Sequence, residues 1–162
     1  MKFFNGFCVK VDKDFFSEYI EDKEFVVAGF SYGAQKAVDY VLNTSQRVDK
    51  LQLLSPAFFD YNQKLIDLNV RAFRKNKELY IKNFLNKAGI KNIDKAECFE
   101  KDLIELFSFD WKKINKIKNI KIEVFLGEFD KIIALKKAYE FFKNYGDVYF
   151  IKKANHFLKE LD

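Results

Sequence analysis

The chain has 162 residues, a net charge of +5 from 29 lysines and arginines against 24 aspartates and glutamates, one histidine and two cysteines. This length can bury roughly 70% of the unfolded surface, which is enough for one core and too little for two domains. A single histidine and the spacing of Cys8 and Cys98 argue against a metal centre, no organic cofactor is implied, and no apolar run approaches the ~18 residues that cross a bilayer.

The predicted elements alternate between strands and helices. In chain order they are a strand near 2–4, a helix near 14–22, a strand at 25–29, a helix at 32–45, a strand at 49–54, a helical stretch, a strand at 120–126, a helix at 134–145 and a strand at 147–152. This order predicts one α/β domain over 1–162, with a minimal, mostly parallel sheet and right-handed crossovers. The stretch 60–118 has helical apolar spacing and is too long for a loop, so we expect a helical cap inserted there.

Gly29-Phe30-Ser31-Tyr32-Gly33 is the most informative motif. A serine in a G-x-S-x-G pentapeptide between a buried strand and a helix is typical of a nucleophile elbow, where the tight turn leaves no room for a Cβ at either glycine. The alternative is a glycine-rich turn with an idle serine. We take Ser31 as the candidate nucleophile because an acid and a histidine follow it in the chain order of an α/β-hydrolase.

The candidate acid and base come from the last two strands. Asp130 follows the strand that ends at Gly127, and His156 follows the last strand. Parallel sheets place their sites beyond the carboxyl ends of their strands, which favours catalytic roles for both. Asp130 could instead cap the next helix, and Glu128 is the reserve candidate for the acid.

These residues predict hydrolysis of an ester or thioester by a Ser31–Asp130–His156 triad. The backbone N–H groups of Tyr32 and Phe7 are the expected oxyanion-hole donors. Cys8 is a poor candidate nucleophile, since neither a helix start nor a second base lies beside it. The N-terminus lacks a signal-peptide pattern, so we expect a cytoplasmic protein. Basic residues are interleaved with acidic ones and no nucleic-acid motif occurs, so nucleic acid is not an expected partner.

The chain resembles the small pimeloyl-acyl-carrier-protein methyl ester esterases of biotin synthesis, in particular the short BioV-type form of Helicobacter and its relatives. The resemblance runs nearly end to end and is carried by the opening Lys2-Phe3-Phe4-Asn5-Gly6-Phe7, the Ser31 pentapeptide with Ala34, the segments Lys121–Gly127 and Asp130-Lys131-Ile132, and the closing Asn155-His156. It implies an α/β-hydrolase fold, the same triad, and cleavage of the methyl ester of pimeloyl-acyl carrier protein. Larger hydrolases open with extra strands and a His-Gly pair, which this chain lacks.

An acidic carrier protein would suit the charge of the cap. Residues 60–91 contain eight lysines and arginines against three acids, so their net positive charge equals that of the whole chain. Such a face raises encounter rates with an acidic partner. Arg71, Arg74 and Lys75 are the candidate carrier-binding residues, the arginines because their forks suit carboxylate or phosphate. A solvated helix face is the alternative for each.

Aromatic residues offer an apolar path for an acyl chain of medium length, although ordinary core positions are the alternative for each of Phe58, Phe59, Phe73, Phe84 and Phe107. Three functions therefore stay open. They are the carrier-protein methyl ester esterase, another small serine hydrolase such as an acyl thioesterase or short-chain carboxylesterase, and a non-catalytic binding protein on the same fold.

Overall fold

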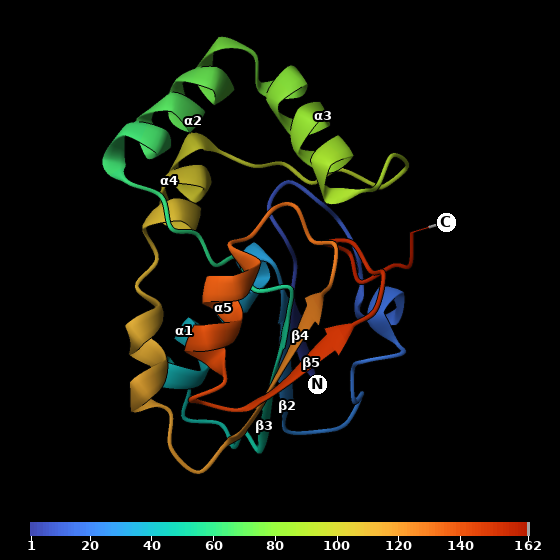
Figure 1. The fold of residues 1–162 in the computed structure, drawn as a ribbon. Coiled ribbons are helices and arrows are strands. Elements are labelled where there is room, and N and C mark those ends of the chain that lie inside the picture. The colour runs from blue at the N-terminus through green and yellow to red at the C-terminus, as the bar shows by residue number, and fades with distance from the viewer. Residues whose placement is uncertain (162) are drawn as a thin grey trace.

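A single sheet of five parallel strands forms the centre of the computed structural model, which describes residues 1–161 (Figure 1). The strands lie side by side in chain order, with the bounds β1 Lys2–Phe4, β2 Val26–Phe30, β3 Lys50–Leu54, β4 Lys121–Gly127 and β5 Asp147–Ile151. Each predicted strand is present to within a residue or two. The predicted α/β fold with a minimal parallel sheet is confirmed.

Five α-helices and two 3-10 helices connect the strands. They are η1 Lys13–Phe16, α1 Tyr32–Asn43, α2 Gln63–Lys75, α3 Lys77–Ala88, α4 Glu100–Ser108, η2 Trp111–Lys116 and α5 Leu135–Phe142. The starts of α2 and α3 are fixed by Asn62 and Asn76, whose side chains each accept a hydrogen bond from a backbone N–H of the first turn at 3.0 Å. Gly89, in the left-handed conformation at φ 88°, ends α3.

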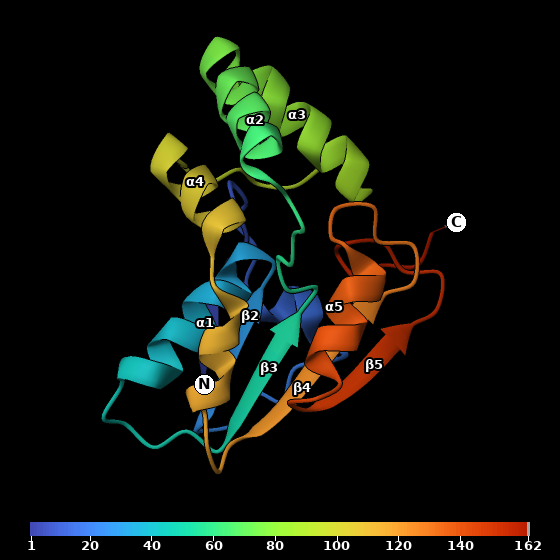
Figure 2. The ribbon, with the colours of Figure 1, turned by 60° about the vertical axis from the view of Figure 1, so that its left-hand side comes forward.

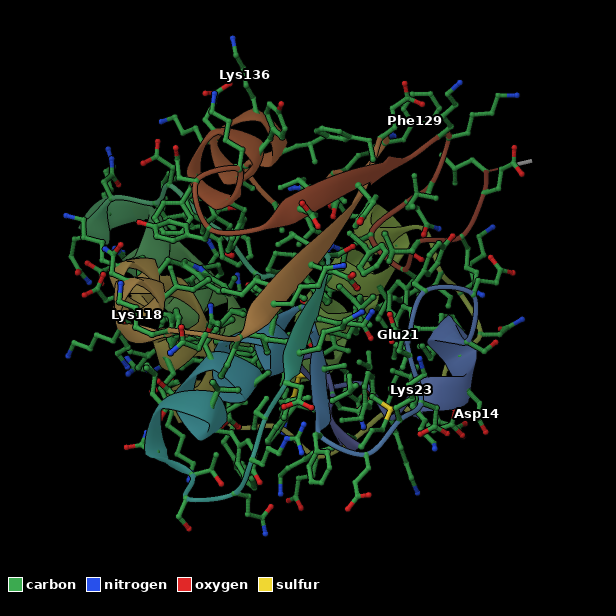
Figure 3. The ribbon with its side chains drawn as sticks, turned by 90° about the horizontal axis from the view of Figure 1, so that it is seen from below. Asp14, Glu21, Lys23, Lys118, Phe129 and Lys136 are labelled. Carbon is green, nitrogen blue, oxygen red and sulfur yellow. A yellow bond between two sulfur atoms is a disulfide. The ribbon has the colours of Figure 1, made fainter. Side chains whose placement is uncertain are left out.

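The two faces of the sheet are covered differently. Phe4 of β1 packs against Tyr40 of α1, whereas the neighbouring Phe3 packs against Phe16 of η1. Adjacent strand residues point to opposite faces, so α1 and η1 cover opposite faces. Seen along the sheet, α1 and α5 lie on one side, and the connection that carries Asp14, Glu21 and Lys23 lies on the other (Figure 3).

The β1–β2 connection differs in hand from the connections through α1 and α5. All of these steps cross the sheet in the same direction between parallel strands, but the β1–β2 connection uses the opposite face. Connections of this kind are right-handed in about 98% of cases. The prediction that all crossovers are right-handed is therefore wrong.

The prediction of a helix near 14–22 is also wrong, because the only helical residues in this region are the four of the 3-10 helix η1, Lys13–Phe16. The reason lies in the sheet. Buried Gln52 of β3 accepts a hydrogen bond from the backbone N–H of Glu21 at 2.9 Å and donates one to the carbonyl of Tyr19 at 3.1 Å. These backbone groups would otherwise take part in a helical hydrogen-bond ladder.

Glu123 of β4 is buried beside Gln52 on the same face. Burial alone would raise the pKa of Glu123, but hydrogen bonds from Lys121, Gln52 and Lys50 hold it below its ordinary value. The carboxylate accepts from Gln52 at 2.9 Å and from Lys50 at 3.2 Å. A charged group in the middle of the sheet is thus fully paired.

The helices α2, α3 and α4, which we call the cap helices, lie beyond the carboxyl ends of the strands (Figures 1 and 2). The last part of the expected 60–118 cap lies elsewhere. Trp111 of η2 packs edge-on against Phe142 of α5, with ring centroids 5.0 Å apart. The cap helices therefore occupy residues 63–108, and the chain returns to the side of the sheet at η2.

A disulfide between Cys8 and Cys98 ties the loop after β1 to the segment before α4. The same two segments form a bridge at Val9 and Lys95, and the Ala96 N–H donates to the Cys8 carbonyl at 3.0 Å. Both cysteines are buried. A separation of 90 residues left no signal of this pairing in the sequence. Among residues 1–161 no helix combines the length and apolar character that a bilayer crossing requires.

Candidate active site

Ser31 lies on the sharp turn between β2 and α1, with φ 55° and ψ −115°. This conformation is unusual for a residue with a side chain and is typical of a nucleophile elbow. The flanking glycines allow the turn to form. A Cβ on Gly29 would lie 2.2 Å from the carbonyl oxygen of Gly33, and one on Gly33 would lie 2.1 Å from that of Phe4.

Asp130 and His156 come to Ser31 from the ends of β4 and β5. His156 Nε2 lies 2.9 Å from Ser31 Oγ, and His156 Nδ1 lies 2.7 Å from Asp130 Oδ2. A carboxylate can only accept, so Nδ1 carries the proton and Nε2 accepts from the serine hydroxyl. Ser31 is 2% exposed and His156 1%, so this relay is shielded from bulk water. The arrangement can deprotonate Ser31 as it attacks a carbonyl carbon.

The structure separates the two candidate acids. The second oxygen of Asp130, Oδ1, accepts a hydrogen bond from the backbone N–H of Ile132 at 2.8 Å, which fixes the plane of the carboxylate. Glu128 points elsewhere and accepts from the backbone N–H of Lys153 at 2.8 Å. Asp130 therefore caps a turn and contacts the histidine as well, whereas the alternative interpretation expected it to cap the next helix. It does not cap α5, whose N-cap position is Ala134.

Phe7 and Tyr32, the candidate oxyanion-hole residues, lie close together. Their rings meet edge to face, with centroids 6.3 Å apart. Tyr32 is the first residue of α1, where a backbone N–H has no acceptor within the helix. Phe7 precedes Cys8, which has φ 59°. The two predicted donors thus come from the turn after β1 and the start of α1, the helix that follows Ser31.

A cavity of about 250 Å³ lies between the cap helices and the sheet domain. Its apolar wall is formed by Phe7, Phe59, Phe84, Leu103, Leu106, Phe107 and Ile132. Three of the five phenylalanines proposed for an acyl path are in this wall. Phe58 is not, since it packs on Trp111 and Phe141, and Phe73 is buried between Phe7 and Tyr80. Phe84 lies edge-on to His156 at 6.4 Å and so links the cavity to the relay.

Polar residues of the cavity were missed by the sequence reasoning. They are Tyr61, Asn69, Tyr80, Asn83 and Lys87. The Tyr80 hydroxyl donates to Asn69 Oδ1 at 2.7 Å, which ties α3 to α2. A signal existed in α3, because positions 80, 83, 84 and 87 share one helical face and a purely structural face would be apolar.

Side chains of α1 hold α4 in place. The Tyr32 hydroxyl donates to Glu105 at 2.6 Å, and Lys36 pairs with the same carboxylate at 3.1 Å. Burial, together with the Glu105 carboxylate, raises the pKa of Tyr32 to about 12. The Gln35 amide donates to the Leu106 carbonyl at 2.9 Å. The helix that follows Ser31 is thus bonded directly to the cap helix α4.

The candidate carrier-binding residues are exposed on α2, but they differ in their partners. Arg74 forms a two-fold hydrogen-bonded pair with Glu100 of α4, and this pairing keeps its pKa above its ordinary value. Neither Arg71 nor Lys75 forms a salt bridge within the part of the chain that the structure describes. Arg71 and Arg74 line a shallow groove between α2 and α4, apart from the cavity. Residues 1–161 contain no cluster of three or more metal-ligating His, Cys, Asp or Glu side chains.

The sequence matches no family model and no curated protein. Solved structures do resemble it. An esterase (EaEST) from Exiguobacterium antarcticum is 17% identical with a TM-score of 0.62, over 78% of this chain and 57% of that one. MenH from S. aureus is 16% identical with a TM-score of 0.57, over 83% and 62%.

A third similar structure is the naproxen esterase (carboxylesterase NP) from Bacillus subtilis, which is 19% identical with a TM-score of 0.53, over 82% of this chain and 53% of that one. The chain thus spans little more than half the length of these relatives. At such identities the likeness shows the shared fold.

Proposed function

We propose that the chain is a serine carboxylesterase that cleaves the methyl ester of pimeloyl-acyl carrier protein in biotin synthesis. The observation that carries the esterase part is the continuous relay from Ser31 through His156 to Asp130, at 2.9 and 2.7 Å. The serine also has the backbone conformation of a nucleophile elbow, which costs of order 1–3 kcal/mol to hold and is found chiefly at functional sites.

The chemistry follows from this geometry. Ser31 Oγ attacks the ester carbonyl while its proton passes to His156 Nε2. The oxyanion that forms is stabilised by the backbone N–H groups of Tyr32 and Phe7. As the intermediate collapses, His156 gives the proton to the departing methoxide, which leaves as methanol. A water molecule then repeats the sequence on the acyl-enzyme and releases the free carboxylate.

The cavity supports an acyl substrate of limited length. Its volume of about 250 Å³ corresponds to roughly eight water molecules at their liquid volume, which suits a short or medium acyl chain better than a long one. Its wall is largely aromatic and aliphatic, whereas Lys87, Asn83 and Tyr61 bring polar atoms to it. An acyl chain attached to a polar carrier arm needs this combination of an apolar interior and polar groups.

The pimeloyl-carrier substrate is supported by the resemblance in the motif regions and by the basic cap. Arg71, Arg74 and Lys75 would meet the acidic carrier protein on the outer face of α2. Arg74 is already paired with Glu100, so the proposal rests more on Arg71 and Lys75. Electrostatic attraction of this kind acts mainly on the association rate and weakens with salt.

A second candidate is an acyl thioesterase or a general short-chain carboxylesterase, which would use the same relay. The small cavity favours it, because a short ester fits there without a carrier. The names of two of the similar solved structures, an esterase and a carboxylesterase, agree with this candidate as well.

The decisive experiment is mass spectrometry of pimeloyl-acyl carrier protein methyl ester incubated with the protein. A loss of 14 mass units means methyl ester cleavage, whereas release of the free carrier means thioester cleavage. Labelling by a fluorophosphonate separates both activities from a non-catalytic binding protein. Ser31→Ala and His156→Ala should each remove nearly all turnover, ~10⁶-fold in related triads. Substantial hydrolysis by either variant would contradict the proposed relay.

A further inference from the structure

Asn155, the residue before the candidate base, is the centre of the loop that carries His156. Asn155 Oδ1 accepts hydrogen bonds from the backbone N–H groups of Phe157 at 2.9 Å and Lys159 at 3.2 Å. The Asn155 backbone N–H donates to the Lys159 carbonyl at 2.9 Å, and its carbonyl accepts from Leu158 at 3.0 Å. The loop that presents His156 is thus closed around this one buried side chain.

The other end of the Asn155 amide leaves this loop and reaches the cap. Its Nδ2 donates to the carbonyl of Gly89, the residue that ends α3, at 3.0 Å. Only a glycine permits this approach, because a Cβ on Gly89 would lie 2.7 Å from Asn155 Nδ2. On the opposite side the Asn155 carbonyl packs on Gly127, where a Cβ would lie 2.3 Å away. Asn155 therefore contacts the end of β4 that leads to Asp130, the loop that carries His156, and Gly89 at the end of α3.

Helix α3 is also the helix that lines the cavity. Tyr80, Asn83, Phe84 and Lys87 contribute to its wall, and the ring of Phe84 lies edge-on to His156. The next residues along α3 end at Gly89. A group that fills the cavity therefore contacts the helix that leads directly to Gly89, whose carbonyl accepts from the Asn155 amide.

We propose that Asn155 is a positioning residue that aligns His156 with Ser31 and makes this alignment depend on the place of α3. This inference rests on the proposed esterase function. An acyl group long enough to occupy the cavity fixes α3 and, through Gly89 and Asn155, the imidazole. An acetyl group leaves the cavity empty, so the rate of its hydrolysis gains less from this alignment. Small errors in the alignment of reacting groups, of about 1 Å, can cost as much as 10²-fold in rate.

The test compares turnover of p-nitrophenyl hexanoate and p-nitrophenyl acetate in variants that cut the link from each side. Asn155→Asp keeps the Oδ1 acceptor of the loop and replaces the donor to Gly89 by a repelling oxygen. Gly89→Ala leaves Asn155 intact and pushes it away. Asn144→Ala is the matched control, since Asn144 also donates to backbone carbonyls, at the exposed end of α5.

We expect Asn155→Asp and Gly89→Ala each to lower kcat for the hexanoate about tenfold, to lower kcat for the acetate by less, and to keep both KM values within about twofold. Because they cut the same contact, the double variant should lose no more than the worse single variant. Asn144→Ala should match the wild type. Thermal unfolding of each variant shows that it is folded, so that a lower rate reports on the alignment and not on lost protein.

Three results would overturn the role of Asn155. These are hexanoate rates within twofold of wild type in both variants, equal losses on the two esters, and losses that add in the double variant. A wild type that neither reacts with the fluorophosphonate nor hydrolyses either ester would instead overturn the esterase function and this role with it.

Discussion

Replacing Asp130 by asparagine tests the relay most sharply, because the structure dictates how the new amide must lie. The carboxylate accepts from the Ile132 N–H at 2.8 Å on one oxygen and contacts His156 Nδ1 at 2.7 Å with the other. In Asp130→Asn the carbonyl must face Ile132, since the opposite orientation would place two donors together. The amide NH₂ then faces His156 and forces the proton onto Nε2.

A histidine protonated on Nε2 cannot accept the proton of Ser31. The Asp130 and His156 side chains are 0% and 1% exposed, so no water is available to reverse the arrangement. The loss expected from this wrong tautomer is on the order of 10⁴-fold in kcat, which corresponds to about 5.4 kcal/mol of transition-state stabilisation.

The assay is hydrolysis of p-nitrophenyl acetate at equal protein concentration, with thermal unfolding to show that the variant is folded. Glu128→Gln is the control. Its side chain can still accept from the Lys153 N–H, so its kcat should stay within about threefold of the wild type. A folded Asp130→Asn that retains more than a tenth of the activity, or a Glu128→Gln that loses more than Asp130→Asn, would refute the assignment of the acid.

Three further predictions concern the surface, the disulfide and the buried carboxylate. Arg71→Glu should raise KM for the carrier-bound substrate severalfold at low salt and leave p-nitrophenyl acetate hydrolysis unchanged. Lys118→Glu is the matched control and should alter neither, because Lys118 precedes β4 at the end of the sheet opposite the cap helices (Figure 1). Equal effects of the two changes would disprove docking on α2. Replacing both Cys8 and Cys98 by serine should lower the free energy of unfolding by roughly 2–5 kcal/mol in urea, and a reductant should do the same to the wild type only. Because the pKa of Glu123 is lowered in the folded state, its contribution to stability should be present above about pH 4.3 and be lost as the pH falls below that value. The urea midpoint of Glu123→Gln should therefore vary less with pH in this range than the midpoint of the wild type. Parallel curves for the two proteins would contradict this pairing.

The sequence was sufficient to predict the parts of the fold that steric requirements fix locally. The observed turn around Ser31 has no room for a Cβ at Gly29 or Gly33, so the two glycines that it requires were visible in the sequence. The strands were equally readable, since short apolar runs in an alternating pattern allow few alternatives. The positions of Asp130 and His156 followed from the rule that parallel sheets carry their sites at the carboxyl ends of strands.

The sequence favoured Asp130 over Glu128, but spacing alone could not explain the choice. The structure supplies the reason, because the Ile132 N–H holds the Asp130 carboxylate at His156 while Glu128 accepts from Lys153. Features that depend on residues far along the chain were not predicted. The helix expected near 14–22 is replaced by a short η1 because Gln52, some thirty residues away, bonds its backbone. The helical spacing of Tyr80, Asn83 and Lys87 was visible in the sequence, but the packing of α3 on α2 through Tyr80 and Asn69 was not.

The Cys8–Cys98 bond makes the oxidised chain a closed ring with a short N-terminal tail, which contains β1, and a long C-terminal tail. Ser31 belongs to the ring, whereas Asp130 and His156 both belong to the C-terminal tail. Ser31 is thus separated from Asp130 and His156 in covalent topology, and the three side chains meet only when the C-terminal tail docks on the ring. A protease that cuts once within α2 or α3 would open the ring without releasing a fragment. The two pieces would migrate as one band on a gel until a thiol reductant is added. They would then separate into two bands, one for the fragment before the cleaved bond and one for the fragment after it.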